Sequence, residues 1–214
     1  MKEKSRLNYL IPWLLFYLVI PFSYLLLGNF PKRTVLKNAI SFLTLGAYFI
    51  MLGQFYLSRS NVIMLRGQKM SKVFKLHKVL SYIFIPILIS HPFLIVVPRF
   101  FESGVEPIEA FRTIMTTFGS RGIVLGIFAM VLMLFLGITS IFQKKMQRNY
   151  RSWRISHGLL SSVFIVLATW HAVDLGRHTD IILSAYMIIL LTGGIFLLIR
   201  TYFIEMQRGD SRNG

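Results

Sequence analysis

Six long apolar stretches, separated by short polar segments, run along the chain. They cover about residues 9–28, 36–57, 73–97, 121–142, 155–174 and 181–203. Each is close to the ~20 residues that an α-helix needs to cross the hydrocarbon core of a bilayer. The first follows MKEKSR, but its apolar run is longer than that of a signal peptide and no small-residue cleavage site follows it. The pattern predicts an all-α integral membrane protein: a six-transmembrane-helix bundle that forms a single domain over residues 1–214.

The basic residues between these stretches predict the orientation of the bundle. With the N-terminus inside, the inner segments hold 17 of the 24 Lys and Arg residues, and the outer segments hold 7. Cytoplasmic loops carry such an excess, so we expect a multi-pass protein of the cell membrane with both termini in the cytoplasm. Lys32, Arg33 and Lys37, near the first outer loop, run against the bias. The net charge of +16 is split into short blocks, which argues against a nucleic-acid partner.

The outer connection over residues 98–120 is the longest. Within it, Pro107 precedes Ile108, Phe111 and the pair Ile114 and Met115, which recur at helical spacing. Proline suits the first turn of a helix, and an amphipathic helix can lie on a membrane surface. A short surface helix and an irregular loop both fit this segment.

Two histidine pairs have identical spacing within the apolar stretches. His77 and His91 lie fourteen residues apart in the third stretch, as do His157 and His171 in the fifth. Fourteen helical residues leave two side chains within ~40° of one face and ~21 Å apart along the axis. Both helices run outward, so His77 and His157 share the inner depth, and His91 and His171 share the outer depth. This geometry predicts two stacked bis-histidine haems between the third and fifth helices.

Composition narrows the choice of cofactor. The chain is 55% hydrophobic, has a mean hydropathy of +0.62 and contains no cysteine. Disulfides, thiolate-bound iron–sulfur clusters and covalent haem are therefore excluded. Four histidines in two layers ~21 Å apart cannot converge on one zinc ion. We expect two haem b groups, with iron held by His77 and His157 in the inner layer and by His91 and His171 in the outer layer.

Other readings of single residues stay open. A histidine in an apolar helix can simply hydrogen-bond a neighbouring helix, although ionisable groups at membrane depth are functional by default. His178, in a short outer loop, fits either a proton donor near the outer haem or a solvated polar residue. The propionates need cations near each layer, and Arg154 and Arg99 are the candidates. Other cations are placed similarly, and all of them also fit orientation signals: Lys78, Arg121, Arg151 and Arg177.

The segments around the histidines resemble the ferric reductase-like transmembrane domain. The resemblance rests on Leu76 to Tyr82, Ser90-His91-Pro92, Trp153 to Gly158, and Trp170-His171, and it extends over nearly the whole chain. That superfamily includes NADPH oxidases, eukaryotic ferric reductases and the haem-binding membrane subunit of the bacterial methionine sulfoxide reductase system. It implies a membrane cytochrome b that conducts electrons from a cytoplasmic-side donor to an extracytoplasmic acceptor, such as ferric iron or a partner reductase.

Two departures from the family pattern shape this expectation. The oxidases and ferric reductases usually continue into flavin- and nicotinamide-binding domains, whereas about ten polar residues follow the sixth stretch here and no glycine-rich dinucleotide fingerprint is present. We therefore expect a separate flavoprotein reductase or a quinol as donor. The methionine sulfoxide reductase subunit, which is the alternative, usually lacks an inner histidine such as His77. A membrane haem carrier or sensor, without electron conduction, is an alternative of another class.

Overall fold

The computed structural model describes residues 10–28, 33–57, 61, 65, 69–101, 104, 106–143, 149–176 and 179–210. Apart from turns and short connections, these residues are helical, and they form no strand. The elements in chain order are α1 (Leu10–Leu14), η1 (Leu15–Val19), α2 (Ile20–Leu27), α3 (Val35–Gly53), η2 (Gln54–Leu57), α5 (Met70–Val96), η3 (Val97–Phe100), α6 (Pro107–Thr116), α7 (Arg121–Ile141), α8 (Tyr150–Leu175) and α9 (Ile181–Asp210).

Five of the described helices are long and apolar enough to cross a membrane. They cover Val35–Leu57, Met70–Phe100, Arg121–Ile141, Tyr150–Leu175 and Ile181–Phe203. The first apolar helix, Ile11–Leu27, is shorter. The predicted all-α membrane architecture is confirmed, and the protein is a multi-pass membrane protein.

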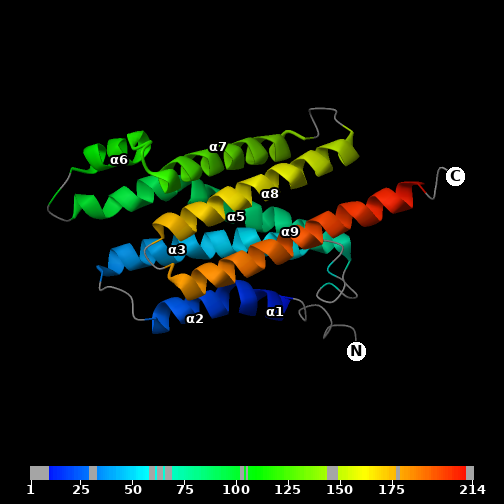
Figure 1. Ribbon diagram of the computed structural model, residues 1–214, viewed down its shortest axis with the longest axis horizontal. Coiled ribbons are helices and arrows are strands. Elements are labelled where there is room, and N and C mark those ends of the chain that lie inside the picture. The colour runs from blue at the N-terminus through cyan, green and yellow to red at the C-terminus, as the bar shows by residue number, and fades with distance from the viewer. Residues whose placement is uncertain are drawn as a thin grey trace.

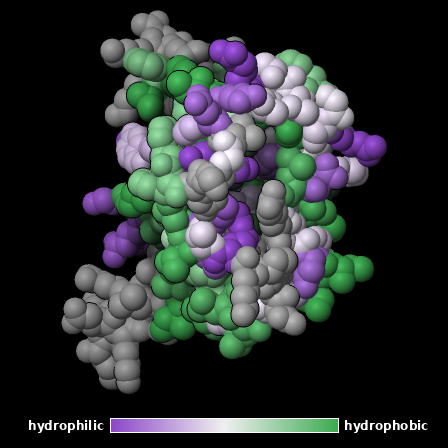
Figure 2. Space-filling model, turned by 90° about the vertical axis from the view of Figure 1, so that its left-hand side faces the viewer, coloured by the Kyte–Doolittle hydropathy of each residue, from purple (hydrophilic) through white to green (hydrophobic). Residues whose placement is uncertain are grey.

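The exterior of the bundle is apolar, as a lipid-facing surface must be. On α7, Phe128, Val131, Phe135 and Ile138 recur at helical spacing and are each more than half exposed. Figure 2 views the end of the bundle that carries α6 and shows hydrophilic residues near the middle of that end, with hydrophobic residues over much of the flanks. Such an apolar surface is unfavourable in water but favourable in the hydrocarbon core of a bilayer.

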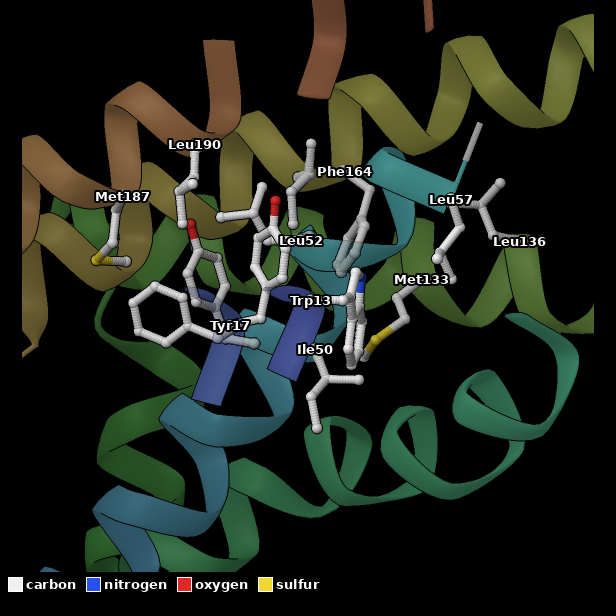
Figure 3. Packing of buried hydrophobic residues seen from close by; sticks show 14 of the residues in the cluster. Trp13, Tyr17, Ile50, Leu52, Leu57, Met133, Leu136, Phe164, Met187 and Leu190 are labelled. Atoms are coloured by element: carbon white, nitrogen blue, oxygen red, sulfur yellow. The ribbon is translucent and has the colours of Figure 1, made fainter. Parts of the chain in front are cut away.

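The first helix packs into the centre of the molecule. Trp13 and Tyr17 lie in one buried cluster with Leu52, Phe164 and Met187 (Figure 3). The Trp13 indole donates a hydrogen bond of 2.9 Å to the Gly53 carbonyl, which ties α1 to α3. Within this helix η1 is a π-helical turn, where the Ile20 N–H bonds the Leu15 carbonyl. Pro21 follows directly and has no N–H to donate, so the regular ladder is interrupted there.

The two ends of the bundle differ. α1 begins and α9 ends at one end, and α6 lies at the opposite end (Figure 1). α6 begins with Pro107 in its first turn, and its Phe111 stacks on Phe93 of α5 with ring centres 4.8 Å apart. Of the two structures that the sequence allowed for this connection, the short helix is therefore the one formed.

Candidate functional site

α5 and α8 carry the four histidines and run in the same direction (Figure 1). α5 packs mainly against α3, and α8 packs mainly against α7 and α9. Among the described elements, α5 and α8 approach each other less closely than any of these pairs. Each histidine is half-buried. The fold thus holds two parallel histidine-bearing helices apart, with supporting helices behind them.

In the outer layer, His91 of α5 and His171 of α8 face each other. Their ring centres are 6.2 Å apart and their planes are nearly perpendicular, at 87°. An imidazole nitrogen binds a metal at about 2 Å and its ring centre lies about 1.1 Å further away, so two axial imidazoles on one iron hold their ring centres about 6 Å apart. The observed separation matches this requirement.

His171 is also anchored to α7. Its Nδ1 lies 2.8 Å from the carbonyl oxygen of Gly122. A carbonyl oxygen can only accept, so Nδ1 is the donor, and Nε2 is the ring nitrogen that remains available to bind a metal. On the same side, a Cβ on Gly126 would lie 2.5 Å from the His171 Nδ1. The outer histidine of α8 therefore rests directly on the backbone of α7.

In the inner layer, His157 is supported by an aromatic ring. Trp153, one turn earlier on α8, stacks on the imidazole with ring centres 5.0 Å apart and planes at 26°. His77 of α5 is close enough to His157 for the two imidazoles to interact electrostatically. One turn after His77, the Ser81 hydroxyl lies 2.9 Å from the His77 carbonyl oxygen and 3.1 Å from Oε1 of the buried Gln54. The inner layer thus joins α5, α8 and η2.

Two buried imidazole nitrogens have no hydrogen-bond partner among the described residues: Nδ1 of His91 and Nδ1 of His157. There is one in each layer. A polar nitrogen without a partner is unfavourable in a bilayer, where water cannot satisfy it. An unpartnered buried imidazole nitrogen in each layer is compatible with a further group that binds there.

The two arginines that the sequence proposed for propionates lie differently. Arg154, one turn before His157 on α8, is half-buried, and its guanidinium sits 5.8 Å from the ring centre of Tyr150. Its carbonyl accepts a hydrogen bond of 3.0 Å from Tyr202 of α9. Arg99 is exposed on η3, and its Nη1 lies 3.6 Å from the position of a Cβ on Gly104. In the chain, Arg154 lies three residues before His157, whereas Arg99 lies eight residues after His91.

Some residues near the histidines pack in the core, and others lie outside the described chain. Phe164 lies in the buried cluster, and Phe84 packs against that cluster. Both therefore contribute to core packing between the layers. His178 and Arg177 lie outside the described residues, as do residues 144–148 of the basic inner loop.

The residues present fit haem better than a bare metal ion. Among the described residues, no three His, Cys, Asp or Glu side chains come together to hold a metal ion. A haem iron takes four nitrogens from the porphyrin, so it needs only two protein ligands. The 6.2 Å separation in the outer layer and the unpartnered nitrogen in each layer are compatible with this ligand set.

Comparison with known proteins agrees with this architecture. Residues 43–168 match the family model described as the ferric reductase like transmembrane component. The matched range contains His77, His91 and His157 and stops three residues before His171. The chain belongs to this ferric reductase-like transmembrane family, which confirms the resemblance seen in the sequence and supports a membrane electron-transfer component.

A relative from Archaeoglobus fulgidus, named only as an uncharacterized protein, is 38% identical over 168 residues. The alignment covers 78% of this chain and 91% of the relative. No solved structure matches the chain.

Sequence reasoning missed three supporting contacts. The Gly122 carbonyl as partner of His171 was invisible, because a backbone acceptor has no side-chain signature. The G-x-x-x-G spacing of Gly122 and Gly126 permits close helix approach but does not identify a partner. The Trp153–His157 stack follows from i, i+4 spacing, which could have revealed it. The hydrogen bond from Ser81, one turn after His77, to Gln54 crosses 27 residues of sequence and carries no local signal.

Proposed function

We propose that this protein is a membrane cytochrome b that moves electrons from a cytoplasmic-side donor, through two haem b groups, to an extracytoplasmic acceptor. The observation that carries the proposal is the presence of two histidine pairs on parallel helices, with His91 and His171 separated by 6.2 Å. Haem b held by two histidines would supply a reversible one-electron couple and would have no open site for substrate. Such a centre suits electron transfer.

Within this proposal, each histidine pair and each arginine has its own role. His77 and His157 hold the inner iron, and His91 and His171 hold the outer iron. Arg154 is the proposed cation for an inner propionate and Arg99 for an outer one. The apolar helices keep water away from both layers, since the buried cluster that contains Phe164 lies between them.

The proposed topology has six spans, with the short first helix crossing as well and both termini in the cytoplasm. It rests on the charge bias of the loops and on the arrangement of the helices, since α1 begins and α9 ends at the same end of the bundle. The donor is a separate flavoprotein reductase or a quinol. The acceptor is ferric iron or a partner reductase on the outer side.

Haem stoichiometry tests the cofactor assignment. A pyridine haemochrome assay on haem-replete protein should give two haem b per chain, with low-spin spectra for both. One haem per chain would instead favour the haem-binding subunit of a methionine sulfoxide reductase system. Protein that binds no haem would overturn the proposal.

Sidedness separates conduction from mere haem binding. In vesicles containing the protein, haem reduced from the inside should be reoxidised by a membrane-impermeant oxidant added outside. A haem carrier or sensor would bind the cofactor yet leave it reduced in this assay.

The route of electron entry is tested at the basic inner loop over residues 144–154, which carries five positive charges. These charges would attract an acidic flavoprotein, and salt should weaken the attraction. Joint replacement of Lys144, Lys145 and Arg148 by glutamine should slow reduction by such a donor at low salt. Unchanged rates over a range of salt would leave these residues only a topological role.

A further inference from the structure

We infer that Gly122 and Gly126 of α7 form a backbone seat that fixes His171 as the axial ligand of the outer haem. The inference rests on the proposed function and adds to it a pair of positioning residues. The seat comprises the Gly122 carbonyl oxygen, which accepts the hydrogen bond from His171 Nδ1, and the bare backbone of Gly126, against which the imidazole lies.

The imidazole leaves no room for a side chain at residue 126. A Cβ built on Gly126 would lie 2.5 Å from Nδ1 and 2.6 Å from Cε1 of His171. Real Cβ atoms essentially never approach other atoms so closely, and a planar ring that is also held by a hydrogen bond cannot yield as the end of a flexible chain can. At residue 122, a Cβ would lie 2.6 Å from Asp174 Oδ2 and from Leu175 Cγ. Both glycines therefore let α8 settle onto α7 at the depth of His171.

The seat has a chemical consequence for the ligand. The hydrogen bond holds the proton on Nδ1, and so it directs the Nε2 lone pair toward the partner helix. A hydrogen-bonded imidazole is a more basic ligand, which favours ferric over ferrous iron. Gly122 thus lowers the reduction potential of the outer haem relative to the same site without this hydrogen bond.

Among the described residues, the inner layer has no equivalent seat against His157. Gly158, which follows His157, faces the Tyr202 hydroxyl of α9 and not an imidazole. Nδ1 of His157 has no hydrogen-bond partner among the described residues. The seat is therefore a property of the outer site alone, and a change in it should act on one haem of the two.

The chain offers a matched control on the same helix. At Gly137 of α7, no atom lies within 4 Å of the position that a Cβ would take, so Gly137→Ala makes the same chemical change in the same helix without touching a histidine. Gly126→Ala should weaken retention of the outer haem by about tenfold or more, in the range seen when a residue that supports a metal ligand is lost. Gly137→Ala should keep both haems.

Haem content, ferric electron paramagnetic resonance and redox titration provide the measurements. The outer haem is identified as the one lost in His171→Ala. In Gly126→Ala its low-spin signal should disappear or change to high-spin, while the inner haem keeps its signal and potential and so reports an intact fold.

Two results would overturn the seat. One is an outer haem in Gly126→Ala that is unchanged in content, signal and potential; the other is equal loss of both haems, which would make Gly126 a general packing residue. Failure of the proposed function looks different, because the unchanged protein would then bind no haem at all.

Discussion

The inner and outer histidine layers use the same two helices and the same residue type, yet the structure supports them by different means. At the outer layer, His171 rests on the α7 backbone and donates to the Gly122 carbonyl. At the inner layer, His157 stacks on Trp153 of its own helix. A hydrogen bond fixes which nitrogen carries the proton, whereas stacking fixes only the plane of the ring. If both pairs bind haem as proposed, the comparison predicts two centres with the same ligands but different electronic properties.

The largest difference between the two layers should appear when the four histidines are replaced one at a time. His77→Ala and His157→Ala should each remove the inner haem or leave it five-coordinate, and His91→Ala and His171→Ala should do the same to the outer haem. In every case one haem of two is affected, because each pair shares a depth. Optical spectra and haem content measure the result.

A histidine outside the apolar stretches serves as the control for this series. His178→Ala should retain both haems, because neither role that the sequence allows for this residue, proton donor or solvated polar residue, makes it an iron ligand. If His77→Ala and His171→Ala disturbed the same haem, the division into an inner and an outer layer would be wrong.

Loss of the Trp153 ring that stacks on His157 in the inner layer should have a smaller effect. Trp153→Leu removes the ring that stacks on His157, whereas Trp153→Phe keeps an aromatic face. An aromatic pair contributes about 0.5–1.5 kcal/mol to stability. The reduction potential changes only by the part of this contribution that differs between the oxidised and the reduced haem. At 59 mV for a tenfold change in a one-electron equilibrium, the inner haem should move by at most about 20–65 mV.

Redox titration of the two haems checks this expectation. The outer haem should keep its potential in both Trp153 variants, and Trp153→Phe should lie between Trp153→Leu and the unchanged protein. A larger movement of the outer haem than of the inner one would contradict the assignment of Trp153 to the inner layer.

The smallest effect concerns the outer end of the bundle and its response to pH. Asp180 accepts a hydrogen bond of 2.9 Å from the Leu183 N–H at the start of α9, and it also accepts one from the Tyr24 hydroxyl of α2. The Leu183 N–H first, and the Tyr24 hydroxyl second, hold the pKa of this exposed carboxyl below its ordinary value of 3.8. Its stabilising contribution is therefore present above that ordinary value and is lost as the pH falls through the lowered pKa of the folded state.

Thermal unfolding of Asp180→Asn against the unchanged protein tests this sign. The variant should melt a few degrees lower at most at neutral pH, and the two curves should converge in strong acid. The inner end should show no such dependence through Tyr202 and Arg154, since their contact uses a hydroxyl and a carbonyl. A difference that widened on acidification would contradict the role of Asp180.

Much of the fold was predictable because the bilayer imposes a simple rule. Every backbone group in the membrane must be bonded within its own segment, so a stretch of about 20 apolar residues becomes a helix. The stretch over 73–97 is thus found as α5, Met70–Val96, and the stretch over 121–142 as α7, Arg121–Ile141. Residues 181–203 begin at the residue where α9 begins, but α9 continues to Asp210, because a helix need not end where hydropathy falls.

The sequence by itself determined the four histidines, their helical register and the apolar helices that carry them, since these depend on residue type and a fixed rise per residue. Tertiary structure alone decided which helices pack together, because lipid-facing and buried positions are equally apolar and leave no pattern to read. It placed the Gly122 carbonyl at His171 and Gln54 near the turn of His77. Such contacts join segments far apart in the chain, and one of them uses a backbone atom that every residue possesses.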